Sequence, residues 1–218
     1  MNNGIKTLIV SGGNSEEKLI NEIYYRNNFD YIIASDKGLE ALDKCKIKPN
    51  FIIGDFDSIN KEILNKYIDD ENIEIRELNP EKDYTDTHMA IKFAIELKST
   101  SVTILGATGT RIDHALSNIN VLKELLDNKI EGKIIDNKNE IQLMNCKKIL
   151  KRDIEYKYIS LIPLTTRVEG VTLKGFKYPL DNACLNIGES LGVSNEQIED
   201  IGLIDIKKGI LILIKARD

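Results

Sequence analysis

The sequence predicts an N-terminal α/β domain with a parallel sheet, followed by an all-β domain in the form of an antiparallel β-sandwich. In the first 135 or so residues, short β-branched runs alternate with longer segments of helical period, which is typical of a parallel sheet covered by helices. Beyond that point, strand-like runs follow one another at short spacing with turns between them, which is typical of a sandwich or a small barrel. We place the two domains at residues 1–132 and 133–218.

Each predicted strand of the N-terminal domain is a short apolar run followed by a turn rich in Gly, Asp or Ser. These strands are Lys6–Val10, Tyr31–Ala34, Phe51–Ile53 and Ser101–Leu105. Apolar residues on one face predict helices around 90–95 and 112–126, and a further helix is expected to begin at Ser58. The alternation favours a Rossmann-like arrangement, with helices on both faces of the sheet.

The C-terminal domain is predicted from β-branched runs with few helical segments between them. The expected strands are Glu140–Met144, Tyr156–Leu164, Arg167–Leu173, Gly188–Val193, Ile201–Ile206 and Ile210–Lys215. Between the last two, Lys207-Lys208-Gly209 predicts a hairpin, because glycine readily adopts the positive φ that a tight turn needs.

Composition excludes several classes of protein. A net charge of −5, from 30 basic and 35 acidic residues, provides no basic footprint for nucleic acid. No apolar run approaches the roughly 20 residues of a membrane helix, and the first residues lack a signal-peptide pattern. The three cysteines are widely spaced without a Cys-x-x-Cys pair, which argues against a disulfide framework or a cysteine zinc site. We expect a cytoplasmic protein that binds neither nucleic acid nor a membrane.

Polar residues gather where the predicted parallel strands end. The five clusters are Gly12–Asn14, Ser35–Gly38, Gly54–Ser58, Lys82–Asp86 and Gly106–His114. In an open parallel sheet, ligands bind outside the carboxyl ends of the strands, so the five loops are expected to converge on one crevice.

The chemistry of these loops indicates a magnesium–nucleotide site. Glycines and helix-starting amides, as in Gly106–Gly109, can approach phosphate oxygens closely. Carboxylates are hard oxygen ligands, which suit magnesium carried in on a nucleotide, and basic side chains balance the phosphate charge. The acidic candidates are Asp36, Asp55, Asp57, Asp83 and Asp86, and the basic candidates are Lys37, Lys82 and Arg111.

Three familiar catalytic motifs are excluded. The chain contains neither the Gly-x-x-x-x-Gly-Lys-Ser/Thr phosphate loop nor the Gly-x-Gly-x-x-Gly dinucleotide motif. Gly188–Gly192 matches the Gly-x-Ser-x-Gly elbow of serine hydrolases, but that fold requires a catalytic histidine later in the chain. The two histidines, His88 and His114, both come earlier.

Four motifs, in order along the chain, resemble those of the thiamine pyrophosphokinase (thiamine diphosphokinase) family. Gly54–Ser58 is similar to its Gly-Asp-x-Asp-Ser, Lys82–Asp86 to its Lys-Asp-x-Thr-Asp, and Gly106–His114 to its Gly-Ala-x-Gly-Gly-Arg-x-Asp-His. Ser194-Asn195-Glu196 is similar to the Ser-Asn-Glu of its β-rich half. The chain departs from the family at Thr110, where a second glycine is usual. It also contains no Trp, and Gln197 stands where some members carry an aromatic residue.

The resemblance implies an α/β domain and a β-sandwich assembled as a homodimer, with the thiamine site at the dimer interface. It implies that ATP and thiamine give AMP and thiamine diphosphate with Mg²⁺, the thiamine hydroxyl attacking the β-phosphorus of ATP. Such a transfer depends on positioning and charge neutralisation rather than on covalent work by side chains.

The resemblance and the loop chemistry together assign the site residues. The catalytic set is Asp55, Asp57, Asp83, Asp86, Arg111 and Asp113. The nucleotide-binding set is Gly12, Gly13, Asn14, Asp36, Lys37, Lys82, Gly106, Thr108, Gly109 and Arg111. The metal ligands are Asp36, Asp55, Asp57 and Asp86, and Ser194 and Asn195 bind thiamine by resemblance alone.

Some assignments have structural alternatives. Asp57 could cap the helix expected at Ser58, and Asp36 and Lys37 could simply start the next helix. Asp113 is expected to orient Arg111 or the substrate, His114 to be structural, and His88 to lie on a helix face without a role. Two other functions compete: a pyrophosphokinase for another hydroxymethyl heterocycle, such as a pterin, and a nucleotide-sensing module without turnover.

Overall fold

The computed structural model describes residues 4–79 and 83–218. The chain forms two compact units, Met1–Asn137 and Lys138–Asp218. The first unit extends five residues beyond our predicted boundary, because the segment Glu131–Ile135 is a strand that pairs in parallel with Ser101–Leu105. Each unit is described by itself below.

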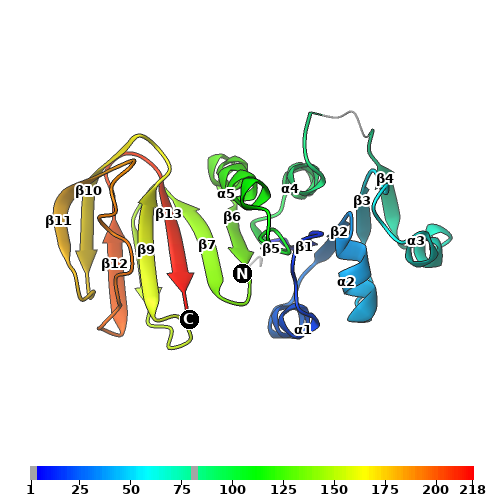
Figure 1. Cartoon of the computed structure of the whole chain (residues 1–218), viewed down its shortest axis with the longest axis horizontal. Helices are drawn as coiled ribbons and strands as arrows, with labels where there is room; N and C mark the ends of the chain where they lie inside the picture. The colour runs from blue at the N-terminus through cyan, green and yellow to red at the C-terminus, as the bar shows by residue number, and fades with distance from the viewer. Residues whose placement is uncertain (1–3, 80–82) are drawn as a thin grey trace. The chain divides into compact units, whose positions relative to one another are not determined.

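The first unit contains a parallel sheet with strand order β4-β3-β2-β1-β5-β6 (Figure 1). Its strands are β1 (Lys6–Val10), β2 (Tyr31–Ser35), β3 (Phe51–Gly54), β4 (Glu74–Glu77), β5 (Ser101–Leu105) and β6 (Glu131–Ile135). The chain builds from β1 to β4 towards one edge and then adds β5 and β6 on the other side of β1. The order therefore reverses between β1 and β5, and this reversal is the topological switch point of the sheet.

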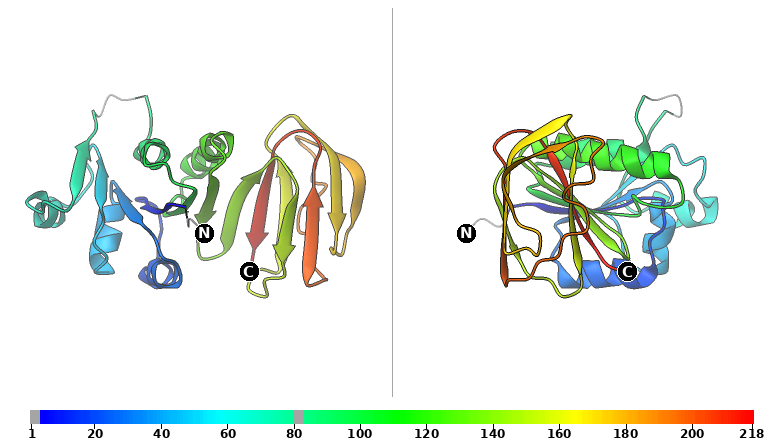
Figure 2. Two further views of the ribbon diagram at one scale, coloured as in Figure 1. Left: turned by 180° about the vertical axis from the view of Figure 1, so that it is seen from behind. Right: turned by 60° about the vertical axis from the view of Figure 1, so that its left-hand side comes forward.

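Helices cover both faces of this sheet, as the alternating sequence predicts. They are α1 (Glu17–Arg26), α2 (Gly38–Lys44), α3 (Lys61–Ile68), α4 (Asp86–Glu96) and α5 (Ile112–Asp127). Figures 1 and 2 show α1 and α2 on one face and α4 and α5 on the other. The core beside α1 and α2 takes Leu8 and Val10 from β1 but not the intervening Ile9, as the two-residue period of a strand requires.

The start of α3 decides one of the alternatives raised above, and the start of α4 has a side-chain cap of its own. Helix α3 begins at Lys61, and the side chain of Asn60 caps it by accepting a hydrogen bond of 2.9 Å from the backbone amide of Glu62. The expected helix start at Ser58, and with it the capping role considered for Asp57, was wrong. Helix α4 begins at Asp86, and the Thr85 hydroxyl accepts from the amide of His88 at 3.3 Å.

The second unit is an antiparallel β-sandwich. Its strands are β7 (Asn139–Met144), β8 (Lys148–Lys151), β9 (Tyr158–Pro163), β10 (Arg167–Lys174), β11 (Leu180–Asn186), β12 (Ile201–Asp205) and β13 (Leu211–Ala216). One sheet has the order β7-β13-β9 and the other β11-β10-β12-β8. Leu161 and Leu213 of the first sheet pack in one core with Leu173 and Ile204 of the second, which confirms the predicted fold class.

Two details of the predicted sandwich were wrong. Gly188–Val193 is a turn-rich connection rather than a strand, since both of its glycines have positive φ, and the strand lies earlier, at β11. The hairpin around Gly209 does not form, because β12 pairs with β10 and β8 while β13 pairs with β7 and β9. Gly209 has the expected positive φ of 101°, but it connects two sheets instead of two paired strands.

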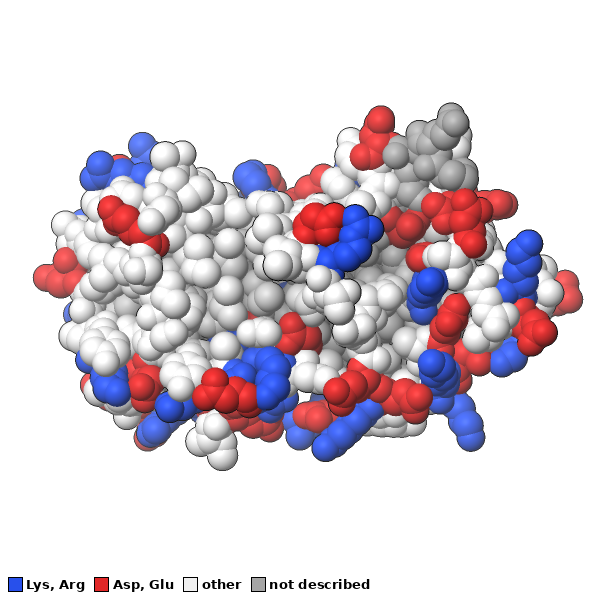
Figure 3. Space-filling view, viewed as in Figure 1, with Lys and Arg blue, Asp and Glu red and all other residues white. Residues whose placement is uncertain are grey.

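Charged side chains of both signs are interspersed on the face drawn in Figure 3, where no continuous basic surface forms. Among the helices in residues 4–79 and 83–218, none is long and apolar enough to cross a membrane.

Candidate functional site

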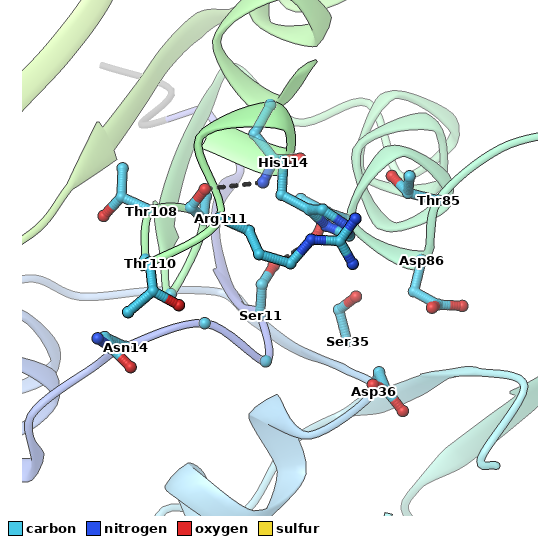
Figure 4. Close-up of a pocket in the computed structure, with 17 residues that line it drawn as sticks. Ser11, Asn14, Ser35, Asp36, Thr85, Asp86, Thr108, Thr110, Arg111 and His114 are labelled. Atoms are coloured by element: carbon cyan, nitrogen blue, oxygen red, sulfur yellow. Dashed lines mark hydrogen bonds between the residues drawn. The ribbon is translucent and has the colours of Figure 1, made fainter. Parts of the chain in front are cut away.

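A pocket of about 330 Å³ opens at the switch point of the parallel sheet (Figure 4). Its walls are the loops that follow β1, β2 and β5, together with the first turns of α4 and α5. Among the predicted site residues, those that line it are Gly12, Gly13, Asn14, Asp36, Asp86, Gly106, Thr108, Gly109 and Arg111. Three of the five predicted polar clusters, and the helical end of a fourth, therefore meet here.

The glycine-rich loops after β1 and β5 pack directly against each other. The Gly13 amide donates to the Gly106 carbonyl at 2.8 Å, and a Cβ on Gly13 would lie only 2.3 Å from that oxygen. Gly106 has a φ of +68°, and a Cβ there would lie 2.2 Å from the Ser11 carbonyl oxygen. Glycine is required at both positions, and it leaves the backbone accessible to a ligand. Thr110 is not among the residues with positive φ, so its side chain in place of the usual glycine does not strain this turn.

Asp36 is the acidic side chain most directly prepared for a ligand. Its backbone adopts a left-handed conformation with φ of 49°, which non-glycine residues seldom adopt. One carboxylate oxygen, Oδ2, accepts a hydrogen bond of 2.7 Å from the Ser58 hydroxyl. The other, Oδ1, is buried and has no hydrogen-bond partner among the described residues. A buried carboxylate oxygen is costly to leave unpaired, so this atom fits a cation or a donor from a ligand.

Asp55 and Asp57 lie in the loop after β3, outside the residues that line the pocket. The Asp57 amide donates to Asp55 Oδ1 at 3.2 Å, and Phe56 between them has a φ of 61°. The loop after β2 is adjacent, because Asp36 donates its amide to the Ile53 carbonyl at 2.9 Å. The two aspartates thus belong to the same edge of the sheet as Asp36.

Three further predicted residues of the first unit, Asp83, Lys37 and Asp113, lie outside the pocket lining, and one cannot be placed. Asp83 is exposed in the turn before α4, and Lys37 is the N-cap residue of α2, the structural role considered above. Lys82 lies outside the described residues.

Arg111 and Asp113 form an exposed pair at the start of α5. Arg111 Nη2 donates to Asp113 Oδ2 at 2.6 Å and Nε donates to Oδ1 at 3.2 Å, so the contact is bidentate. The guanidinium lowers the pKa of the Asp113 carboxyl below its usual value, and the carboxylate in turn raises the pKa of Arg111. Arg111 also lines the pocket at a helix N-terminus, where backbone amides and the helix dipole favour anions.

Several pocket residues were given no binding or catalytic role from the sequence, although five of them lie within the predicted polar clusters. They are Ser11, Ser35, Thr85, Thr87, Ala107, Thr110, His114 and Asn118. The Thr87 hydroxyl donates to Ser11 Oγ at 3.0 Å, and Asn118 Nδ2 donates to the Ala107 carbonyl at 2.8 Å. Position offered a signal for the serines, because each stands at the carboxyl end of a predicted strand.

The two predicted thiamine contacts in the second unit, Ser194 and Asn195, differ in burial and in hydrogen bonding. Asn195 is 4% exposed, and its side chain accepts from the amides of Tyr178 and Glu196 and donates to the Tyr178 carbonyl. These bonds use its polar atoms to hold the loop together. Ser194 is exposed, with a φ of 56°.

The acidic residues of this edge do not form a metal site by themselves. Within residues 4–79 and 83–218, no three His, Cys, Asp or Glu side chains are grouped closely enough to hold a metal ion. Magnesium commonly uses only one or two protein carboxylates and completes its shell with phosphate oxygens and water. The orphaned Oδ1 of Asp36 fits such a partial ligand set.

Both units match descriptions of one family. Residues 24–134 match "Thiamin pyrophosphokinase, catalytic domain", and residues 146–211 match "Thiamin pyrophosphokinase, vitamin B1 binding domain". The chain is 34% identical over 215 residues to thiamine pyrophosphokinase from Bacillus subtilis, covering 98% of this chain and all of that protein. It is 28% identical over 206 residues to thiamin pyrophosphokinase 1 from Caenorhabditis elegans, covering 89% and 79% of the two chains.

Solved structures agree with the sequence matches. The Bacillus subtilis thiamine pyrophosphokinase structure superposes with a TM-score of 0.88 at 33% identity, covering 98% of this chain and 99% of that one. Yeast thiamin pyrophosphokinase, at 17% identity, shares the fold with a TM-score of 0.83 over 100% of this chain and 88% of its own. These relatives support thiamine rather than a pterin as the acceptor. The chain belongs to the thiamine pyrophosphokinase family of ATP-dependent pyrophosphotransferases.

Proposed function

We propose that the pocket at the switch point binds the phosphates of ATP for pyrophosphoryl transfer to thiamine. The observation that carries this proposal is the buried, unpartnered Oδ1 of Asp36, which lies beside two interlocked glycine loops and the N-terminus of α5. Glycine loops and helix amides suit phosphate oxygens, and an unpaired carboxylate suits the cation that accompanies them.

Mg²⁺ would be held by Asp36 together with one of the other acidic residues assigned to it, Asp55, Asp57 or Asp86, and the polyphosphate would complete its ligands. When bound, it would neutralise the charge that develops on the phosphoryl oxygens during transfer. Asp36 supplies the unpartnered oxygen, and Asp86 supplies a carboxylate from the first turn of α4.

The remaining residues position and polarise the polyphosphate. Asp113 accepts from Nε and Nη2 of Arg111 and fixes the orientation of the planar guanidinium, whose remaining N–H donors can face the polyphosphate at the pocket wall. The loops at Gly12–Asn14 and Gly106–Gly109 offer backbone amides. The thiamine hydroxyl attacks the β-phosphorus and gives up its proton, the bond from the β-phosphorus to the oxygen shared with the α-phosphorus breaks, and AMP leaves with that oxygen.

The second unit would supply the thiamine contacts, from a partner subunit of a cytoplasmic homodimer. Ser194 is the candidate contact, because its side chain is exposed, whereas Asn195 positions the loop. In a twofold dimer, each of two sites would combine the first unit of one chain with the second unit of the other.

The products of turnover test the proposal. We expect ATP, thiamine and magnesium to give AMP and thiamine diphosphate in equal amounts on ion-exchange chromatography. Formation of ADP with thiamine monophosphate would contradict pyrophosphoryl transfer. Replacing thiamine by a hydroxymethyl pterin tests the other acceptor, and the appearance of a pyrophosphorylated pterin would contradict the assignment of thiamine.

A further inference from the structure

Ser35, at the end of β2, has a buried hydroxyl that the roles above do not use. The residue is 1% exposed, and its Oγ has no hydrogen-bond partner among the described residues. Ser35 lines the pocket, and Figure 4 shows its side chain pointing into it, among Asp36, Asp86 and Arg111. A buried hydroxyl without a partner is unfavourable in the resting protein, unless a ligand satisfies it.

A second hydroxyl lies beside it. The register of β1 and β2 pairs Val10 with Ala34, so Ser11 and Ser35 occupy the next positions on adjacent strands. Ser11 is 3% exposed and accepts the hydrogen bond that Thr87 donates, which leaves its own proton available for donation. Two buried hydroxyls therefore face the same pocket as potential donors.

Asp36 Oδ1 is the other buried atom at this site without a hydrogen-bond partner among the described residues. Its chemistry, with that of Ser35 Oγ, determines which ligand satisfies both atoms. A carboxylate only accepts hydrogen bonds, and so does a fully ionised phosphate oxygen, so Asp36 can approach a phosphate only through a cation. A serine hydroxyl can donate to the phosphate directly. A carboxylate oxygen that can bind a cation and a neighbouring hydroxyl that can donate to an anion together fit a magnesium–polyphosphate, in which cation and anion lie side by side.

We propose that Ser35 is a phosphate-binding residue, whose hydroxyl donates a hydrogen bond to an oxygen of the nucleotide polyphosphate. This inference rests on the proposed function in placing ATP in the pocket. It predicts an unusual pair of effects for one substitution. Ser35→Ala should weaken nucleotide binding and should not weaken the nucleotide-free fold, because it removes a polar group that only the ligand satisfies.

Calorimetric titration of the full chain with magnesium and α,β-methylene ATP measures the first effect. This analogue is suitable because transfer breaks the link between the α- and β-phosphorus atoms, which a methylene bridge blocks. For Ser35→Ala we expect a Kd roughly tenfold or more above that of wild type, the loss of one hydrogen bond to a charged group. The thermal unfolding midpoint of the nucleotide-free variant should equal or exceed that of wild type.

Ser99 provides a matched control. It is also buried, at 4% exposure, but its Oγ lies 2.7 Å from the Thr7 hydroxyl, and it does not line the pocket. Ser99→Ala should therefore lower the unfolding midpoint and leave the Kd of the analogue unchanged. The inference would be overturned if Ser99→Ala raised the Kd of the analogue more than Ser35→Ala, and Ser35→Ala lowered the unfolding midpoint more than Ser99→Ala.

Further titrations distinguish a failure of the Ser35 inference from a failure of the proposed function. Titrations with EDTA in place of magnesium should show the same loss for Ser35→Ala, whereas a loss seen only with magnesium would assign the hydroxyl to a metal-bound water and overturn the phosphate contact. Unchanged affinity in folded Ser35→Ala would overturn the inference alone, and wild type that fails to bind the analogue would overturn the proposed function with it. Should Ser35→Ala not fold, Ser35→Cys preserves the volume with a weak donor, and its wild-type affinity would equally overturn the inference.

Discussion

The imidazole Nε2 of His88 lies 2.8 Å from Oε1 of Glu124, so a hydrogen bond connects α4 to α5. Lys92 approaches the same carboxylate oxygen at 3.5 Å, and the Tyr84 ring packs edge-on against His88. Helix α4 starts at Asp86, and α5 starts immediately after Arg111. His88 is therefore more than a helix-face residue without a role, because its contact joins the first turn of α4, part of which lines the pocket, to the last turns of α5.

Removing the Glu124 carboxylate should loosen this connection. We expect Glu124→Ala to lower the free energy of unfolding by about 1 kcal/mol, the typical contribution of a hydrogen bond, and to reduce turnover several-fold. Urea denaturation and steady-state assays measure the two effects. Asp127→Ala is the control on the same helix, since its ion pair with Lys123 is about half exposed and should contribute little. Equal effects for both variants would show that the contact between helices has no special importance.

The acidic loop after β3 should be essential for turnover but not for folding. Asp55→Asn and Asp57→Asn preserve the shape while removing charge available to a hard cation, so each should reduce kcat by on the order of a hundredfold or more at saturating magnesium. Circular dichroism and steady-state rates are the measurements, and the exposed Asp69→Asn provides the control. Near-normal turnover in both loop variants would assign these residues to the turn alone.

The geometry of Arg111 should matter more than its charge. Arg111→Lys keeps the positive charge but loses the bidentate fork, and we expect at least a tenfold fall in kcat/KM, from an interaction of transition-state type. Asp113→Asn keeps the arginine and should have a smaller effect. Both residues are about two-thirds exposed, so neither variant should shift the unfolding midpoint measurably. A larger fall in kcat/KM for Asp113→Asn than for Arg111→Lys would instead place Asp113 in direct contact with substrate.

A shared site predicts rescue between two inactive chains. Asp57→Ala disables the first unit, and Ser194→Arg blocks the exposed contact of the second without disturbing the buried Asn195. After joint unfolding and refolding, half of the dimers should be mixed, each with one intact site, giving roughly a quarter of wild-type activity. Recovery near zero, with mixed dimers verified by mass spectrometry, would place each site within one chain.

Strand prediction succeeded where a run of apolar or alternating residues marks the strand and failed where the strand has no such pattern. The bounds of β1 and β5 agree with prediction because both are central strands with continuous apolar runs. Strand β4, Glu74–Glu77, is mostly exposed at the edge of the first unit's sheet, and β6 begins with Glu131 and Gly132, so neither has an apolar pattern. The false hairpin at Gly209 shows that a local turn signal cannot specify which strand is the partner.

The pocket was predictable in outline, because the carboxyl ends of parallel strands must share one edge of the sheet. Position placed Ser11 and Ser35 at that edge, but it could not show that the Ser35 hydroxyl is buried without a partner, since a serine at a strand end is typical of any turn. The thiamine contacts were the least accessible to prediction. Asn195 matches a family motif, yet its side chain is committed to the backbone of Tyr178, which only the folded loop reveals.

The left-handed backbone of Asp36 lowers the stability of the fold at a residue that we propose for activity. A residue with a Cβ held at this φ costs of order 1 kcal/mol or more, a cost that glycine avoids. Its orphaned carboxylate oxygen adds a further penalty in the absence of ligand. Laboratory selection for heat resistance alone should therefore favour Asp36→Gly, and the thermostable survivors would have lost the carboxylate that we propose as a cation ligand. Heat-stable and active descendants would have to gain their stability elsewhere in the chain.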